Sequence, residues 1–439
     1  MDIATISLLL VVAMAALLIT GLPLAFVTGA VAMGAALILF GPNALQLIAS
    51  RTYTLMGEFV LVAVPMFVLM ASILERSGVA RDLFRAMHVW AGGLRGGLAI
   101  QTLIAAVLMA AMTGIIGGEI VLLGLIALPE MLRRGYDRKL AIGVVCAGGS
   151  LGTMIPPSIV LIVYGLTANV SIGDLFLATV TPGLLLAALY VGYVLVLCHL
   201  RPGAGPPAPP HERHVPLAEK LALLRGLVLP LAVAAWVLGT IYAGIASVSE
   251  AAGMGVVGAI ASAAVRRELT WIMIRDALHQ TMSTCGMLLW LTFGANALIG
   301  VYNLMGGTRF IQGLMSGMPL DPILVVVIMM AVLIVLGLFL DWIGICLLTM
   351  PIFVPAVVAL GLDPIWFGIL FCMNMQVSYL SPPFGPACFY LKGVAPPEIS
   401  LNQIFSAMWP FIGLQVVAIT LVLLYPDIAM WLPRAVYGP

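Results

Sequence analysis

Long runs of apolar residues follow one another along this sequence. Many run for about 17 residues or more, and roughly 20 apolar residues form a helix that crosses the ~30 Å hydrocarbon core of a bilayer. A helix also satisfies its own backbone hydrogen bonds, which lipid cannot do. The pattern predicts an all-α polytopic membrane protein surrounded by a lipid bilayer.

Paired prolines interrupt two of the apolar stretches. The stretch over 140–166 is broken around Pro156-Pro157, and the stretch over 363–391 is broken around Pro382-Pro383. Proline has no backbone N–H, and its ring clashes with the preceding helical turn. Each stretch is therefore predicted to be one membrane crossing made of two half-helices.

Lysine and arginine occur in groups that orient the chain, because these residues are retained on the cytoplasmic side of a membrane. The four groups are Arg76, Arg81, Arg85 and Arg95; Arg133, Arg134, Arg138 and Lys139; Arg201, Arg213, Lys220 and Arg225; and Arg266, Arg267 and Arg275. Residues 97–132 lie between two such groups, so they enter and leave the membrane on one side. Their centre, Thr113–Glu119, is rich in glycine, which disfavours helix. We predict a re-entrant hairpin over 97–132.

The second half of the chain repeats these features at a constant spacing. The two proline pairs are 226 positions apart, and the same spacing relates Gly118 to Gly344. Helix-breaking residues that fall in register indicate a structural repeat. A second re-entrant hairpin is accordingly predicted over 322–357, with its tip near Gly344.

A Pro- and Gly-rich stretch over 201–216 divides the chain near its midpoint. The first half makes five predicted crossings, an odd number, so the second half is expected to run with inverted topology. The predicted organisation is a first repeat over 1–198, a cytoplasmic linker over 199–225, a second repeat over 226–426 and a C-terminal tail over 427–439. Inverted repeats with broken helices are typical of secondary transporters.

Composition and motifs argue against several other functions. The chain is 63% hydrophobic and 8% charged, and its formal net charge of +1 gives no reason to expect a nucleic-acid partner. Residues 148–152 match the GxSxG pattern of hydrolases, but they lie in an apolar helix rather than between a strand and a helix. The sequence contains no HExxH motif and no phosphate-binding loop. No cofactor is expected. A passive channel and, with less support, an intramembrane enzyme are the alternatives to transport.

The residues around the proline pairs resemble a known family. Ala147–Ser158 looks like the large membrane (DctM-like) subunit of tripartite ATP-independent periplasmic (TRAP) transporters, and so do Phe339–Asp341, Asn374 and Ser381–Gly385. The resemblance covers nearly the whole chain. It implies an elevator-type sodium symporter, with a transport domain that moves against a scaffold, for an organic acid anion. It also implies two partners in the bacterial inner membrane system, a small four-helix (DctQ-like) subunit and a periplasmic solute-binding protein.

The resemblance and the helix breaks together assign candidate site residues. Free carbonyls and hydroxyls at broken helices suit a sodium ion, while half-helix N-termini suit a carboxylate. The candidate sodium ligands are Thr113, Gly114, Gly118, Gly152, Thr153, Pro156, Leu340, Asp341, Gly344, Ser381 and Pro382. The candidate substrate-binding residues are Ser150, Ser158, Asn374, Gln376 and Ser378. Glu119 and Asp341, the acids at the two hairpin tips, are interpreted either as functional groups or as helix caps.

Overall fold

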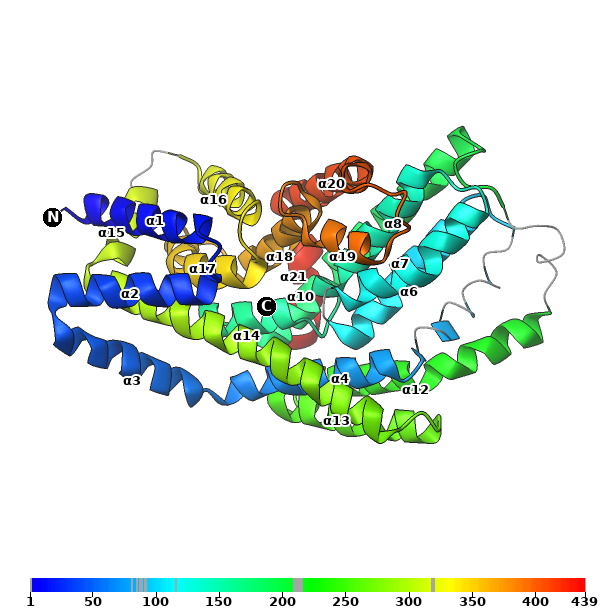
Figure 1. Cartoon of the computed structure of the whole chain (residues 1–439), viewed down its shortest axis with the longest axis horizontal. Helices are drawn as coiled ribbons and strands as arrows, with labels where there is room; N and C mark the ends of the chain where they lie inside the picture. The colour runs from blue at the N-terminus through cyan, green and yellow to red at the C-terminus, as the bar shows by residue number, and fades with distance from the viewer. Residues whose placement is uncertain are drawn as a thin grey trace.

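The chain folds into two consecutive sets of helices (Figure 1). A computed structural model describes residues 2–438 apart from 80–81, 84–85, 87–89, 91–92, 115–116, 208–215 and 317–319, and leaves the side chains of 217–224, 308, 312 and 314–316 undescribed. The first set comprises α1 (Ile3–Ile19), α2 (Leu24–Phe40), η1 (Pro42–Ala44), α3 (Leu45–Met56), η2 (Phe59–Val62), α4 (Ala63–Arg76), α6 (Gly97–Thr113), α7 (Gly118–Arg133), α8 (Arg138–Ser150), η3 (Leu151–Thr153), α9 (Ile159–Ala168) and α10 (Ile172–Leu200). The second set comprises α12 (Leu217–Tyr242), α13 (Val248–Val265), α14 (Trp271–Leu304), α15 (Gly307–Ser316), α16 (Pro322–Gly337), α17 (Trp342–Ala359), α18 (Pro364–Leu380), α19 (Pro386–Val394), α20 (Leu401–Leu424) and α21 (Asp427–Tyr437).

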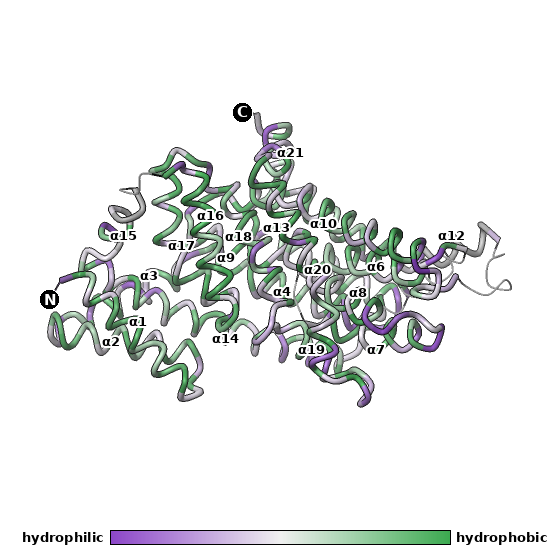
Figure 2. Tube along the Cα trace, turned by 90° about the horizontal axis from the view of Figure 1, so that it is seen from above, coloured by the Kyte–Doolittle hydropathy of each residue, from purple (hydrophilic) through white to green (hydrophobic). Residues whose placement is uncertain are grey.

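Apolar residues run along nearly all of these helices, and hydrophilic residues gather at helix ends and connections (Figure 2). Seven helical segments of the described chain are long and apolar enough to cross a membrane: Phe59–Arg76, Ile172–Leu200, Arg225–Tyr242, Val248–Val265, Trp271–Leu304, Trp342–Ala359 and Leu401–Leu424. Shorter apolar helices, α1 and α2 among them, add to this set. These helices confirm the predicted all-α multi-pass membrane protein.

Two pairs of helices turn back on themselves where hairpins are predicted. The turn between α6 and α7 contains Gly114 at φ 59° and Gly117 at φ 109°, values that only glycine adopts at little cost. Ile115 and Ile116, which belong to the predicted tip, lie outside the described residues. The second pair, α16 and α17, turns at residues 338–341.

Two other helices are interrupted at the paired prolines. After α8 the chain forms the short η3 helix, and α9 begins only at Ile159. Likewise α18 ends at Leu380 and α19 begins at Pro386. The Pro156-Pro157 and Pro382-Pro383 peptide bonds are cis and lie inside these interruptions. Because neither proline of a pair donates a backbone hydrogen bond, carbonyl groups of the preceding turn lose their helical partners.

The two halves are packed into one another rather than side by side. α7, the second arm of the first hairpin, packs against α19 from the second half, and α17 packs against α9 from the first. α8 packs against α20, and α18 against α10. Burial therefore places the two interrupted helices in the centre of the molecule, where their side chains form part of one continuous apolar core.

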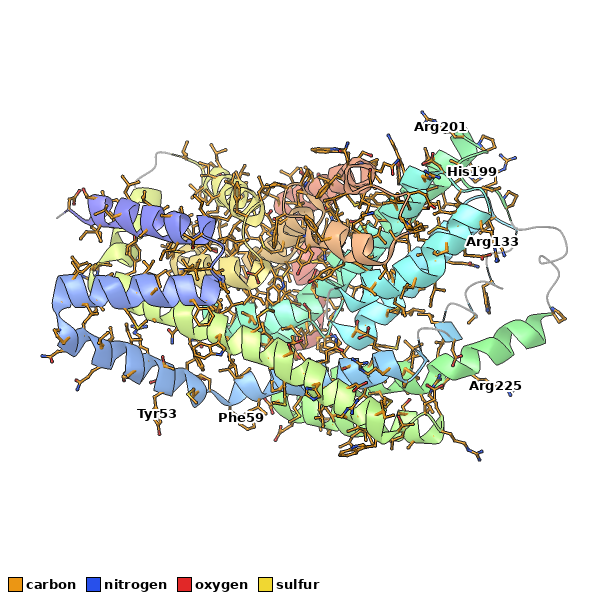
Figure 3. All side chains as sticks on the ribbon, in the orientation of Figure 1. Tyr53, Phe59, Arg133, His199, Arg201 and Arg225 are labelled. Carbon is orange, nitrogen blue, oxygen red and sulfur yellow. The ribbon has the colours of Figure 1, made fainter. Side chains whose placement is uncertain are left out.

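The groups of basic residues come together at one end of the molecule. Arg133, Arg201 and Arg225 lie at the same end in Figure 3. Arg266 joins two further segments there, since its Nε donates to the Ser77 carbonyl at 3.1 Å and its Nη1 to the Gly226 carbonyl at 2.7 Å. The side chains of Arg81, Arg85, Arg213 and Lys220 lie outside the described residues.

Two of the predicted connecting segments contain helices. The linker predicted over 199–225 is partly helical, because α12 begins at Leu217 directly after Pro216, a residue that is well tolerated where helices begin. Residues 208–215 of this linker lie outside the described residues. The predicted tail over 427–439 forms α21, whose Ala429, Met430 and Pro433 are buried in packing against α10.

Candidate functional site

A polar cavity of about 370 Å³ lies where the first hairpin tip meets the first helix interruption. Thr113, Gly114 and Gly118 of the tip line it, together with Thr153 of η3. The second half contributes Trp342 and Ile343 from α17, Tyr379 from α18 and Tyr390 from α19. Four of the candidate sodium ligands thus border one cavity, which is formed by both halves of the chain.

Close backbone contacts hold the hairpin tip against the interruption. A Cβ atom at Gly114 would overlap the carbonyl oxygen of Pro157, and the φ of 59° further restricts this position to glycine. A Cβ atom at Gly152 would lie 3.2 Å from both carboxylate oxygens of Glu119. Glycine at both positions lets the tip approach the interrupted helix at backbone distance. Pro156, also a candidate ligand, is buried beside these residues.

Glu119 is a buried carboxylate with one oxygen that lacks a hydrogen-bond partner. Its side chain is 2% exposed, and its Oε1 accepts a hydrogen bond from Thr113 Oγ1. Its Oε2 has no hydrogen-bond partner among the described residues. No described Lys or Arg forms an ion pair with it, and Glu75 on α4 lies next to the same cavity. An ionised carboxylate in such surroundings is costly unless a cation accompanies it.

A buried amide links the two interruptions directly. Gln376 Nε2 donates to the Ser150 carbonyl at 2.6 Å and also to Thr153 Oγ1. Ser150 and Gln376 are separated by 226 positions, the same spacing that relates the proline pairs. Gln376 Oε1 is buried without a partner among the described residues. Oxygen atoms are therefore concentrated between the two interrupted helices.

The five candidate substrate-binding residues are all buried, and their side chains bond within the helical framework. Ser150 Oγ donates to the Ala147 carbonyl, Ser158 Oγ to the Thr153 carbonyl and Ser378 Oγ to the Asn374 carbonyl, while Asn374 Nδ2 donates to the Met330 carbonyl and Gln376 bonds as described above. None of the five lines the polar cavity. Asn374 and Gln376 connect different helices, whereas the three serines donate to carbonyls of their own segment. Contact of the five with substrate stays a prediction.

The candidate sodium ligands of the second half are not gathered at this cavity. Ser381 Oγ donates to the Val377 carbonyl of its own helix at 2.7 Å, and Pro382 follows it in the second interruption. Asp341 occupies the N-cap position of α17, and its Oδ1 would lie 3.2 Å from a Cβ atom at Gly344. Leu340 lies partly buried beside Asp341 in the turn. Four of the six first-half candidates, Thr113, Gly114, Gly118 and Thr153, line this cavity, and no second-half candidate is among its described lining residues.

Several residues of the cavity were not selected from the sequence. Glu75 follows an apolar stretch and precedes Arg76, so its position in the sequence indicated only that a membrane-crossing helix ends there. Gln280 of α14 lines the cavity and accepts a hydrogen bond from Arg76 Nη2 at 2.6 Å. Tyr379 and Tyr390 resemble packing residues in sequence. The 226-residue spacing relates Tyr390 to Tyr164, which is the only signal that could have drawn attention to it.

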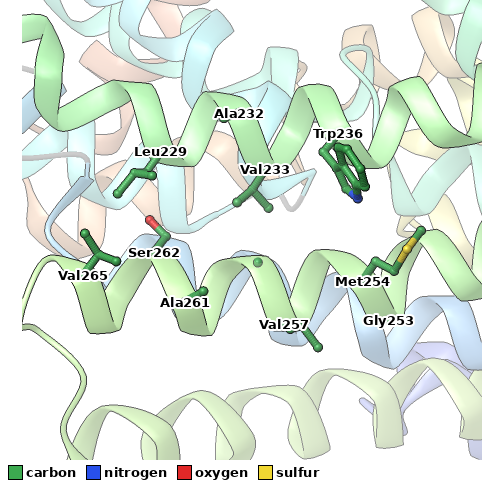
Figure 4. A pocket seen from close by; sticks show the side chains of 11 residues that line it. Leu229, Ala232, Val233, Trp236, Gly253, Met254, Val257, Ala261, Ser262 and Val265 are labelled. Carbon is green, nitrogen blue, oxygen red and sulfur yellow. The ribbon is translucent and has the colours of Figure 1, made fainter.

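A larger cavity of about 730 Å³ has a different character (Figure 4). It lies between α12 and α13, and apolar side chains such as Leu229, Val233 and Trp236 line it. Ser262 is the sole hydroxyl among its described lining residues. The apolar lining of this cavity suits contact with the interior of a membrane and not the binding of an ion.

Comparison with known proteins also indicates a membrane transporter. Residues 11–428 match the family described as "Tripartite ATP-independent periplasmic transporter, DctM component". The chain belongs to this DctM family. It is 29% identical to the C4-dicarboxylate TRAP transporter large permease protein DctM of Vibrio cholerae, over 98% of each chain. It is 30% identical to the protein of the same description from Pseudomonas aeruginosa, over 91% of this chain and 92% of that one.

Other DctM relatives carry different substrate names. The isethionate TRAP transporter permease protein DctMQ of Oleidesulfovibrio alaskensis is 28% identical over 94% of this chain and 64% of its own length. Among solved structures, the YdaH transporter of Alcanivorax borkumensis has a similar fold, with a TM-score of 0.64, 16% identity and 91% coverage of both chains. Membership of the DctM family identifies the chain as the large permease component of a TRAP transporter, not an enzyme.

Proposed function

We propose that this DctM chain imports an organic acid anion together with sodium ions. The observation that carries the proposal is the polar cavity at the first interruption. Glu119 Oε2 is buried there without a partner among the described residues, and Thr113 and Thr153 line the same cavity. Gln376, which does not line the cavity, donates to Thr153 Oγ1, and its own buried Oε1 also has no partner among the described residues. A cluster of oxygen acceptors without an accompanying cation fits a hard cation, which prefers oxygen ligands.

The residues present support the sodium assignment in two ways. Thr113, Thr153 and the backbone around Gly114, Gly118 and Gly152 offer neutral oxygen atoms, and interrupted helices are where coupling ions are bound in other secondary transporters. Glu119 adds a negative charge that offsets part of the cation's dehydration cost. Sodium bound here would join the hairpin tip to η3, so its binding would depend on the position of the hairpin.

We further propose that the halves are inverted repeats that form a scaffold and a moving transport domain. The hydrogen bond between Ser150 and Gln376, which are 226 positions apart, is what a pseudo-two-fold axis between the interruptions would produce. The exchanged contacts of α7 with α19 and of α17 with α9 agree with such an axis. On this proposal the basic end of the molecule is cytoplasmic, in a bacterial inner membrane.

The names of its relatives support the proposed substrate class, and its family supports the proposed partners. C4-dicarboxylates and isethionate, named for two relatives, are small organic anions. We propose that a periplasmic solute-binding protein delivers such an anion and that a small membrane subunit accompanies this chain. The cation site would then balance the charge of the anion during transport.

Uptake by proteoliposomes tests this function. The chain, its small membrane subunit and its binding protein are reconstituted, and uptake of the binding protein's ligand is measured under an inward sodium gradient or an equal potassium gradient. We expect accumulation only with sodium. Glu119→Gln should raise the half-saturating sodium concentration, whereas Glu398→Gln, which alters an exposed acid, should not. Equal ligand flux with either cation would instead indicate a passive channel.

A further inference from the structure

A second cavity, of about 320 Å³, lies further along the helices that line the polar cavity. On α14, Thr284 and Leu288 line the polar cavity, and Thr292 and Asn296 line the second one. These four positions are four residues apart, so they lie on one face of the helix. The α14 residues that line the two cavities lie, on average, roughly 20 Å apart along the helix at 1.5 Å per residue.

Two other helices also contribute residues to both cavities. Val160 of α9 lines the polar cavity, and Val163 and Thr167 of the same helix line the second cavity. Ile343 of α17 lines the first, and Leu347 lines the second. The helices α9, α14 and α17 therefore line both cavities, and we call the face that they share the seam. We call this second space the outer cavity.

The outer cavity differs from the polar cavity in charge. Arg51 of α3 lines it, together with Thr167, Thr292 and Asn296, and its described lining contains no acid. Across the described chain, no carboxylate forms an ion pair with Arg51. The polar cavity has the opposite pattern, with acids and no basic lining residue. Arg51 is half-buried, and an arginine that has no carboxylate partner among the described residues and borders a cavity is a candidate for binding an anion.

Two contacts hold Arg51 beside this cavity. Asn296 Nδ2 donates to the Arg51 carbonyl at 3.3 Å, which ties α3 to α14. Gly300, one helical turn further along α14, leaves room for the arginine stem, since a Cβ atom there would lie 2.5 Å from Arg51 Cδ and 2.7 Å from Nε. The absence of a side chain at Gly300 thus allows the guanidinium to cross α14 closely.

We propose that the outer cavity is a binding site for the carboxylate or sulfonate group of the transported anion. This inference rests on the proposed function, in which an organic anion is the substrate. A guanidinium binds such planar or tripodal oxyanions through two parallel hydrogen bonds, and the neighbouring amide and hydroxyls suit the polar remainder of a small acid. The volume is within the range of small-molecule sites.

The position of the outer cavity assigns it to the first step of transport, before the anion reaches the interrupted helices. Tyr53, on the same helix as Arg51, lies in the opposite half of the molecule from Arg133, Arg201 and Arg225 (Figure 3). With the basic end cytoplasmic, as proposed above, this places Arg51 toward the periplasmic side. The anion binds at Arg51 on the periplasmic side and then moves along the seam to the interrupted helices. Arg51 is thereby a residue of substrate capture, distinct from the cation site.

Chemical protection of arginine tests the proposal without any need for transport. The chain with its small subunit is placed in nanodiscs, and phenylglyoxal modification of Arg51 is followed by peptide mass spectrometry. Potassium succinate and potassium isethionate should each slow the modification several-fold, and neutral succinamide should not. Arg309, an exposed arginine outside the cavity, serves as the internal control and should react at one rate throughout.

Variants separate a binding role from a structural one. Gly300→Ala should abolish the protection while leaving Arg51 reactive, because the added Cβ displaces the arginine stem. In proteoliposomes, Arg51→Gln should raise the half-saturating anion concentration about tenfold or more and leave the half-saturating sodium concentration unchanged. If neither anion protects Arg51, or if both protect Arg309 equally, the proposal is wrong. Failure of sodium-driven uptake in the wild type would count against the proposed function alone, since protection is measured independently.

Discussion

Replacing Thr153 by valine is the most direct test of the cation site. Thr153 is 1% exposed, its Oγ1 accepts the hydrogen bond from Gln376 Nε2, and the same hydroxyl donates to the Ser150 carbonyl at 3.2 Å. Valine keeps the size and branching of threonine and removes only the oxygen. Gln376 retains its bond to the Ser150 carbonyl at 2.6 Å, so its amide stays partly satisfied.

The expected magnitude follows from these contacts. Loss of the two neutral hydrogen bonds of the Thr153 hydroxyl should lower the free energy of unfolding by about 1–3 kcal/mol. Loss of one ligand to a charged partner costs about 1.5–3 kcal/mol, which corresponds to a roughly ten- to hundredfold weaker sodium affinity. The two effects are of similar size but are measured separately, because the lost stability lowers the melting temperature without sodium and the lost ligand weakens the response to sodium. Thr153→Val is expected to remain folded and to bind sodium poorly.

A sodium titration of thermal stability measures both quantities. The melting temperature of the purified chain in nanodiscs is recorded at increasing sodium concentration, with choline added to hold ionic strength constant. Because a ligand at concentration c stabilises the folded state by RT ln(1 + c/Kd), the rise in melting temperature is fitted to this expression, and the fitted Kd is taken as the sodium midpoint. The assay requires neither the substrate nor the binding protein.

Ser381→Ala is the matched control. From the sequence alone both hydroxyls are expected to bind sodium, but in the structure Ser381 Oγ donates to the Val377 carbonyl and lies outside the polar cavity. Its loss should leave the sodium midpoint unchanged. An unchanged midpoint in Thr153→Val would refute the placement of the cation at the first interruption. An equal shift in both variants would show that the second interruption binds sodium as well.

Three further predictions concern the tip, the basic end and the topology. Gly114→Ala should lower the melting temperature and abolish stabilisation by sodium, because a left-handed φ costs a non-glycine residue about 1–2 kcal/mol and the Cβ overlaps the Pro157 carbonyl. Arg266→Gln should destabilise the chain by about 1.5–3 kcal/mol, read as a lower melting temperature with normal sodium affinity, since hydrogen bonds of a charged group are lost. In a cysteine-free background, an impermeant maleimide added to intact cells should label Asn43→Cys and spare Gly203→Cys; the reverse pattern would invert the topology.

Much of the fold could be predicted from the sequence because it depends on local chemistry. Apolar runs of membrane-spanning length predict helices wherever they occur. The helix ends near Thr113, the turn at Gly114 and the interruptions at both proline pairs follow from glycine and proline, whose backbone restrictions act within a few residues. For the same reason the location of the two hairpins and the two interrupted helices matches the predicted ranges within a few residues.

The composition of the cavity could be predicted only in part. Thr153 was selected because it is a hydroxyl beside a helix break, which is a local property. Glu75 and Gln280 come from α4 and α14, whose approach to the first hairpin depends on how whole helices pack. No feature of their sequence neighbourhood distinguishes them from residues at the end or on the surface of an ordinary crossing.

The sequence by itself determined where the backbone must depart from helix, because a missing N–H or a missing Cβ has its effect at the position where it occurs. Only the tertiary structure decided which of these departures meet. The contact between Gln376 and Thr153 joins residues 223 positions apart, and the crossing of Arg51 over Gly300 joins α3 to α14. Such contacts arise from the burial of apolar faces across the whole chain, a non-directional force that no short segment encodes.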